Sequence, residues 1–248
     1  MKKSVITLAA TTLAFAAVTA SFSASAAYKE IAVSNGGSIA GKVSFTGTDP
    51  APKIYAVTKD NDICGTTDRE IDFVKVNNGG LSEAVVFLEK VKEGKAFADE
   101  KGKIDQKGCE FAPFLSVMTN KSDVDAVNVD PILHNIHTYE LISSGKKFAK
   151  KTVFNISQPD KGTVTKHVKL KRGNAMKVEC DAHDFMHGFV FVAKNPYYAI
   201  VDTDGNFKID NVPAGKYKIK AWHGSLGEKK GKVEVAAGGE ASINFEFK

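Results

Sequence analysis

The chain has 248 residues, three cysteines and a formal charge of +5 at pH 7. The lysines are spread along the chain, so this small positive excess predicts no nucleic-acid partner. Beyond the N-terminal region no stretch approaches the roughly 20 apolar residues of a membrane helix, so no membrane span is expected.

The N-terminus is organised like a secretory signal peptide. Lys2 and Lys3 precede an apolar run from Val5 to Ala20, and small residues follow up to Ala24-Ser25-Ala26. This order of charged, apolar and small segments is typical of exported proteins. We therefore expect residues 1–26 to be removed and the mature chain, with a net charge of +3 without the two signal lysines, to be periplasmic.

Short apolar runs between turn residues predict an all-β fold, and helical periodicity is nearly absent. Residues 39–45 alternate between apolar and polar types and end before Gly47 and a Pro-Ala-Pro turn. Residues 81–88 contain the continuous apolar block 84–88, which predicts a central strand buried on both faces. The charged stretch 91–101 is weakly periodic and is expected to be a short helix or a loop.

Two further groups of strands follow. The first spans residues 103–194, and its spacing fits a Greek-key β-sandwich; its expected strands are 114–118, 124–129, 136–141, 164–170, 175–180 and 188–193. The second contains Asp-Gly and Ala-Gly turns that predict hairpins; its expected strands are 198–201, 207–209, 217–222, 232–235 and 241–247.

Residues able to bind a metal gather around one predicted loop. Cys180 ends a strand, and His183 and Met186 follow three and six residues later, so a tight loop can turn all three toward one point. His134 follows a strand and a proline turn, where the end of a sandwich brings a second loop close. A thiolate, two imidazoles and a weak axial thioether form a donor set that favours copper over zinc and occurs in electron-transfer sites. The neighbouring Asn135 could donate a hydrogen bond to the Cys180 sulfur.

At these residues the chain resembles amicyanin and the plastocyanin-like cupredoxins. The resemblance rests on His134-Asn135-Ile136-His137 and on Cys180-x2-His183-x2-Met186-His187-Gly188, and it covers roughly 103–194. It implies a cupredoxin domain with one type 1 copper ion, with His134, Cys180 and His183 as equatorial ligands and Met186 as the axial ligand. His187 departs from the family pattern and could compete for the metal.

The remaining segments resemble a carboxypeptidase regulatory-like domain, which is a transthyretin-like β-sandwich. The resemblance rests on Gly41-Lys42-Val43, the buried block 84–88, Asp204-Gly205-Asn206-Phe207 and Val212-Pro213-Ala214-Gly215. We therefore expect four segments: a signal peptide (1–26), the first part of the transthyretin-like sandwich (27–102), the inserted cupredoxin domain (103–194) and the second part of the sandwich (195–248). Chains with both modules resemble proteins described as methylamine-utilisation-like.

Three cysteines in an exported protein leave one thiol over once a disulfide forms. Cys180 could pair with Cys64 or Cys109, which would abolish the metal site. We favour a Cys64–Cys109 bridge, because the His and Met spacing around Cys180 has no structural purpose.

The other candidate residues have alternative roles. Met186 could be a core methionine rather than a ligand. We expect His137 to point away from the metal, and His167 and His223 to lie at the surface.

The expected function is transfer of single electrons between redox partners, such as a c-type cytochrome or a dehydrogenase, rather than catalysis. A Cys–His nucleophile pair is disfavoured because the chain has no glycine-rich elbow, and six histidines are too few for a multicopper oxidase. A copper carrier or storage protein, or a non-redox structural or binding module, remains an alternative.

Overall fold

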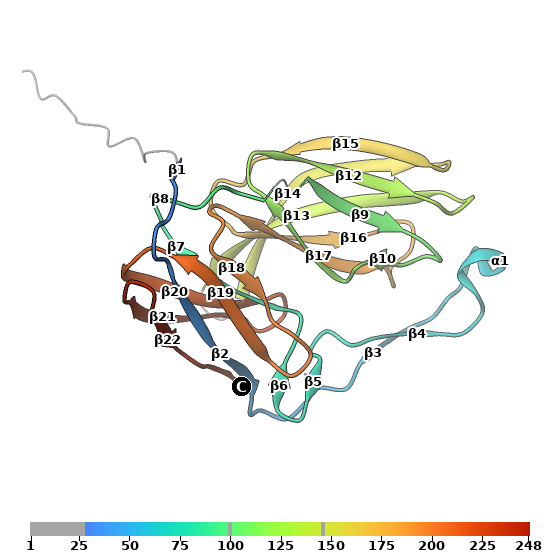
Figure 1. Ribbon diagram of the computed structural model, residues 1–248. Helices are drawn as coiled ribbons and strands as arrows, with labels where there is room; N and C mark the ends of the chain where they lie inside the picture. The colour runs from blue at the N-terminus through green and yellow to red at the C-terminus, as the bar shows by residue number, and fades with distance from the viewer. Residues whose placement is uncertain (1–27, 99–100, 145–146) are drawn as a thin grey trace, which may run out of the picture.

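The computed structural model describes residues 28–98, 101–144 and 147–248 (Figure 1). The fold is all-β, as predicted, and consists of packed β-sandwiches. The signal peptide expected at 1–26 lies outside the described residues. No helix within the described part of the chain has the length and hydropathy needed to cross a membrane.

Residues 102–193 form one sandwich, here called the central sandwich. Its first sheet has the order β10-β9-β12-β15 and its second β11-β17-β16-β13-β14. In chain order the strands are β9 (Gly102–Gln106), β10 (Phe111–Ala112), β11 (Leu115–Thr119), β12 (Ser122–Asn128), β13 (His134–Ser144), β14 (Lys147–Gln158), β15 (Gly162–Val168), β16 (Ala175–Glu179) and β17 (His187–Ala193). The core between the sheets includes Ile104, Val124, Ile136 and Val190, all nearly or fully buried.

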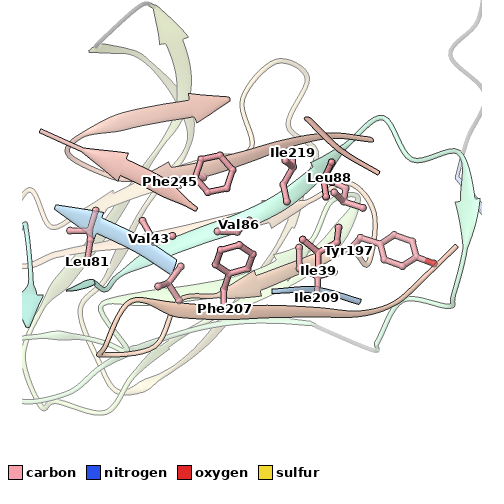
Figure 2. Packing of buried hydrophobic residues seen from close by; sticks show 14 of the residues in the cluster. Ile39, Val43, Leu81, Val86, Leu88, Tyr197, Phe207, Ile209, Ile219 and Phe245 are labelled. Atoms are coloured by element: carbon pink, nitrogen blue, oxygen red, sulfur yellow. The ribbon is translucent and has the colours of Figure 1, made fainter. Parts of the chain in front are cut away.

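Strands from both sides of this region form a second sandwich, here called the flanking sandwich. One sheet has the order β18-β7-β20-β21; the other has the order β19-β2-β6-β5, and β22 and β23 also pair with β2. The strands are β2 (Gly37–Phe45), β5 (Val76–Asn77), β6 (Gly80–Leu81), β7 (Ala84–Glu89), β18 (Tyr198–Ile200), β19 (Asn206–Val212), β20 (Gly215–His223), β21 (Gly227–Val235), β22 (Glu240–Ser242) and β23 (Phe245–Phe247). Figure 2 shows Ile39, Val86, Phe207 and Ile219 meeting in its core.

The two sandwiches pack together through a third apolar cluster. Successive side chains of a strand point to opposite faces. The strand β7 therefore places Val86 in the core of the flanking sandwich, and Val85 and Phe87 in the cluster between the two sandwiches. Phe191 of β17 and Trp222 of β20 meet there with ring centroids 5.9 Å apart. The strand at 84–88 is therefore buried on both faces and lies between β18 and β20, as predicted.

Residues 53–71 form an extended arm made of β3 (Lys53–Tyr55), the one-turn helix α1 (Asn61–Cys64) and β4 (Arg69–Ile71). In Figure 1 the arm runs from the flanking sandwich to the end of the central one. Val57 and Cys64 belong to the core cluster of the central sandwich. The predicted disulfide between Cys64 and Cys109 is confirmed, and Cys180 is a free, buried cysteine.

Some local expectations differ from the structure. Of the helix or loop expected at 91–101, the described residues 91–98 form a loop, but this loop contains the short strand β8 (Glu93–Gly94), which pairs with β1 (Lys29–Glu30). The sequence did not predict β14, a long edge strand that pairs with β13. Its many polar residues do not give the alternating apolar pattern that indicates a strand. The division into domains at 102/103 and 194/195 stays a prediction, because strand pairing does not measure independent folding.

Candidate metal centre

Strand pairing brings the predicted metal donors to one end of the central sandwich. β13 and β16 are antiparallel neighbours, with His137 paired to Glu179. His134 is the first residue of β13, and Cys180 directly follows the last residue of β16. The short connection from β16 to β17 carries His183 and Met186 and is closed by a turn in which Met186 N donates to His183 O at 3.0 Å.

Three of the four predicted donors converge. The ligand atoms of His134, Cys180 and His183 all lie within 4.8 Å of one another. The two Nδ1 atoms of the histidines are 3.2 Å apart, and the Cys180 sulfur is 3.7 Å from His183 Nδ1. All three side chains are buried, with between 0% and 4% of each residue exposed.

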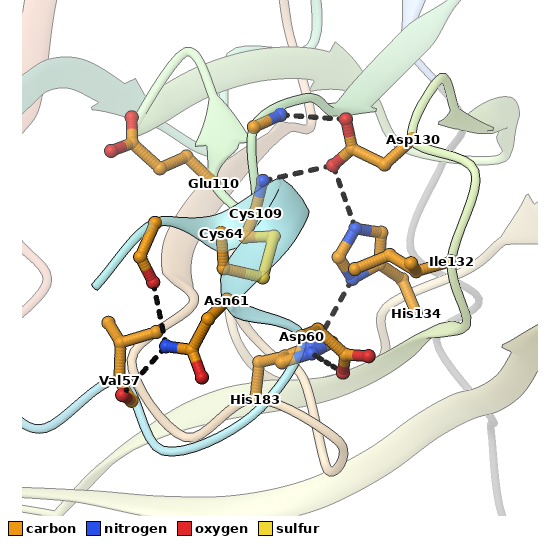
Figure 3. The surroundings of a disulfide bond; sticks show 12 residues. Val57, Asp60, Asn61, Cys64, Cys109, Glu110, Asp130, Ile132, His134 and His183 are labelled. Carbon is orange, nitrogen blue, oxygen red and sulfur yellow. Dashed lines mark hydrogen bonds and ion pairs between the residues drawn. A yellow bond between two sulfur atoms is a disulfide. The ribbon is translucent and has the colours of Figure 1, made fainter.

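The outward nitrogen of each imidazole is held by a carboxylate. His134 Nε2 lies 2.9 Å from Asp130 Oδ2, and His183 Nε2 lies 2.9 Å from Asp60 Oδ2 (Figure 3). An ionised carboxylate only accepts hydrogen bonds, so both Nε2 atoms carry the proton. Both Nδ1 atoms then present lone pairs to each other, an arrangement that a shared cation relieves.

Two backbone hydrogen bonds hold Asp130 in place in addition to its contact with His134. Its two carboxylate oxygens accept hydrogen bonds from the backbone N–H of Gly108 and Cys109 at 2.8 and 2.9 Å. Burial opposes ionisation, but these two hydrogen bonds and the contact with His134 outweigh it, so the pKa of Asp130 lies below its usual value. The outer support of His134 is therefore an anion.

Asp60 reaches His183 from the arm. It directly precedes α1, and its carbonyl accepts the N–H of Cys64 at 2.8 Å. Because Cys64 is bonded to Cys109, the disulfide ties this helical turn to the central sandwich next to Asp130 (Figure 3). One crosslink thus helps to position both outer carboxylates.

The Cys180 thiol lies in surroundings that favour its thiolate. Burial raises its pKa, but the contact with the His183 ring and hydrogen bonds from the backbone N–H groups of Asn135, Ala182 and His183 outweigh burial, and the net shift is downward. The Asn135 N–H donates to the sulfur at 3.3 Å. The expected contact from Asn135 is thus made by its backbone, while its side-chain oxygen accepts the N–H of Asp181.

Met186 is 1% exposed and lies in the same apolar cluster as Cys180. That position is compatible with an axial ligand and with a core methionine, so axial ligation stays a prediction.

A second group of possible metal donors is formed by Cys109, Asp130 and His134. The Cys109 sulfur is already in the disulfide, so this group is the outer support of His134 rather than another site.

The other histidines have different environments. His137 contacts Asp181 and stacks on Tyr139 at 4.1 Å between ring centroids, away from the three donors. His167 is exposed and pairs with Asp123, as expected for a surface residue. His187 packs against the rings of Tyr55 and Phe73, and burial lowers its pKa to about 4; it is not part of the donor group.

The prediction that His223 lies at the surface is wrong. It is 1% exposed and belongs to the end of β20, where its Nδ1 accepts the backbone N–H groups of Ser225 and Leu226. Burial lowers its pKa to about 4. It therefore organises the β20–β21 turn as a neutral ring.

Sequence reasoning missed both outer carboxylates. Asp130 lies four residues before His134, where the Asp-Pro pair indicates only a turn. Asp60 is separated from His183 by 123 residues, and no local pattern connects them. In metal sites a carboxylate frequently holds the second nitrogen of a histidine ligand. The positions of Asp130 and Asp60 are therefore consistent with a metal site at the two histidines.

The arrangement suits a small, soft or borderline metal ion. Two imidazole nitrogens and a thiol favour copper or zinc over calcium or magnesium, which prefer oxygen ligands. The residues present thus fit a copper ion by their chemistry.

Comparisons with known proteins give partial likenesses. Residues 187–243 match the family model described as polysaccharide lyase family 4, domain II. The sequence comparison with curated proteins gives no match. The carboxypeptidase regulatory-like resemblance finds no support in these comparisons.

Several solved structures are similar to part of the chain. A reduced Cu(I) form of an amicyanin mutant is 17% identical and covers 39% of this chain and 85% of its own, with a TM-score of 0.29. A purple cupredoxin from Nitrosopumilus maritimus is 18% identical and covers 38% of this chain and 100% of its own, with a TM-score of 0.29. A copper-containing nitrite reductase from Thermus scotoductus SA-01 is 15% identical and covers 40% of this chain and 24% of its own, with a TM-score of 0.29.

Proposed function

We propose that this protein transfers single electrons in the periplasm through one type 1 copper ion held by His134, Cys180, His183 and Met186. The observation that carries the proposal is the convergence of two imidazole Nδ1 atoms and one free thiol within 4.8 Å, inside a buried shell. Bound there, copper would supply a one-electron couple between Cu(II) and Cu(I).

The outer hydrogen bonds support a site prepared for a metal. Asp130 and Asp60 hold the two imidazoles so that both Nδ1 lone pairs face inward. The Asn135 N–H keeps the Cys180 sulfur pointing at the same place. Such outer contacts fix ligand orientation and adjust the redox potential of the metal.

Burial favours electron transfer over catalysis. A catalytic metal keeps one coordination position open to substrate, whereas each of the four proposed ligands is at most 4% exposed. Electrons can pass through such a shell where a substrate cannot enter. The half-exposed Asp60, hydrogen-bonded to His183, offers a short connection from the donors to solvent.

The partner in this proposal is another redox protein, such as a c-type cytochrome or a dehydrogenase. Electrons would enter and leave one at a time.

The proposal is tested by adding one equivalent of Cu(II) to the purified apo protein and recording the visible spectrum, followed by potentiometric titration. We expect intense blue or green colour from thiolate-to-copper charge transfer and a reversible one-electron step. Both should be absent in Cys180→Ser. A pale complex with no thiolate band would favour a copper carrier, and failure to bind copper would favour a structural module.

A further inference from the structure

A cavity of about 550 Å³ lies beside the junction of the two sandwiches. It is lined by the arm, by residues of strands β13 and β14 and by the turn between β20 and β21. Its volume is within the range of pockets that bind small molecules, which often occur where domains meet. None of the proposed copper ligands lines it.

The floor of this cavity is aromatic and packed. Phe148 and Phe189 line it, and both rings contact Trp222, with centroids 6.3 and 5.8 Å away. The turn at Gly224 lies directly on the Phe189 ring, since a Cβ at that position would be 2.5 Å from the ring. Phe189 is only 5% exposed and reaches the cavity with a small part of its ring, so the partly buried Phe148 ring is the main apolar surface that a flat ligand can contact.

The rim of the cavity is cationic. Lys53, Lys147, Lys150 and Lys177 line it. Lys150 and Lys177 share one carboxylate, Glu179, and within the described residues no ion pair neutralises Lys53 or Lys147. Four lysines with one carboxylate leave an excess of about three positive charges around an apolar hollow.

Two of these ammonium groups converge on one ring. Lys53 Nζ and Lys177 Nζ lie 5.6 and 5.9 Å from the centroid of Phe73, which also lines the cavity. Each of the two ammonium groups therefore adds positive charge beside Phe73, which attracts an anion that enters the cavity. Lys177 is only 19% exposed, so an anion bound there would be partly shielded from water.

We infer that this cavity binds an amphiphilic organic anion. Its flat apolar body lies against Phe148 and Phe189, and its carboxylate or sulfonate group lies among the four lysines. A recessed aromatic floor favours a small molecule over an acidic protein, because a flat protein surface cannot reach the floor. The inference stands independently of copper binding.

The test uses anilinonaphthalene sulfonate as the probe and its uncharged analogue phenylnaphthylamine as the comparison. Trp222 is the only tryptophan in the chain and contacts both floor residues, so energy transfer from Trp222 to the probe reports binding, and the matched variants described below assign that binding to the cavity. We expect saturable binding at one site per chain, and binding of the uncharged analogue at least about tenfold weaker.

Two matched double variants distinguish the effect of the lysines that line the cavity from the effect of the net charge of the protein. Lys53→Gln combined with Lys147→Gln should raise the Kd of the sulfonate about tenfold, since removing one ion pair weakens binding severalfold. Lys161→Gln combined with Lys232→Gln removes the same charge from exposed sites that do not line the cavity and should leave the Kd within about twofold. Denaturant unfolding of each variant verifies that it is folded.

Three results would overturn the inference. The probe could fail to saturate, or it could bind equally well to both double variants. Alternatively, an oligoglutamate peptide could bind with the expected lysine dependence while the aromatic sulfonate does not, which would assign the rim to an acidic protein partner.

Discussion

Replacing Asp130 with Asn tests whether the outer carboxylate sets the proton position on His134. The carboxylate accepts three hydrogen bonds: from Gly108 N, from Cys109 N and from His134 Nε2. An amide has one accepting and one donating end, so in either orientation at least one of these donors meets another donor. If the donating end faces His134, the ring proton moves to Nδ1 and that nitrogen can no longer bind a metal.

The magnitude follows from the hydrogen bonds that the substitution breaks. Breaking one backbone hydrogen bond to a buried charged acceptor costs about 1.5–3 kcal/mol of unfolding free energy. Removing an outer partner of a metal-binding histidine costs about 10- to 100-fold in metal affinity. Asp130→Asn should therefore weaken both the fold and copper binding.

Two assays and one control decide the matter. Competition with a chromophoric copper chelator gives the affinity, and urea unfolding of the apo protein gives the stability. The control is Asp123→Asn, which removes the same kind of carboxylate from His167 where both side chains are at least half exposed, so it should change either quantity by less than about 1 kcal/mol. Asp130→Asn with an affinity and a stability equal to this control would refute the role assigned to Asp130.

Three other predictions concern the fold. Cys64→Ser with Cys109→Ser opens a crosslink spanning 45 residues and should lower the unfolding free energy by about 4 kcal/mol in a denaturant titration; an unchanged midpoint would contradict it. Glu140 accepts the N–H groups of residues 171–173, and these hydrogen bonds outweigh burial and lower its pKa. The ionised Glu140 side chain thus adds to the free energy of unfolding at pH values above its ordinary pKa of 4.5. This stabilisation is lost as the pH falls through the lower pKa of the folded state. The stability advantage over Glu140→Gln in urea titrations should therefore shrink below about pH 4, and a constant difference would argue against it. Phe191→Ala removes a ring that is 1% exposed and touches Phe87 and Trp222; it should cost about 3–5 kcal/mol by calorimetry, and a loss under about 1 kcal/mol would reject this interface.

The proximity of Cys180 and His183 was predictable from the sequence because their spacing is local. Cys180 and His183 are three residues apart on one connection, and the strand that ends at Cys180 was visible as an alternating run. The burial of residues 84–88 was likewise predictable, because a strand that is apolar throughout is expected to be covered on both faces.

What the sequence did not reveal depends on distant contacts. Asp60 supports His183 only because the arm crosses to the other sandwich and is fixed there by a disulfide. His223 was expected at the surface because no other possible metal ligand lies near it in the sequence, yet it is buried beside Phe247 and under its own turn. β14 has an exposed, lysine-rich face, so its pattern does not resemble a buried strand.

The central claim is that one free sulfur and two imidazoles share a single ion. X-ray absorption at the copper edge of protein loaded with one equivalent tests it most directly. The account predicts one short copper–sulfur distance and two imidazoles per copper, and the short copper–sulfur distance should be absent in Cys180→Ser. A copper ion surrounded only by nitrogen and oxygen in the unmutated protein would contradict it.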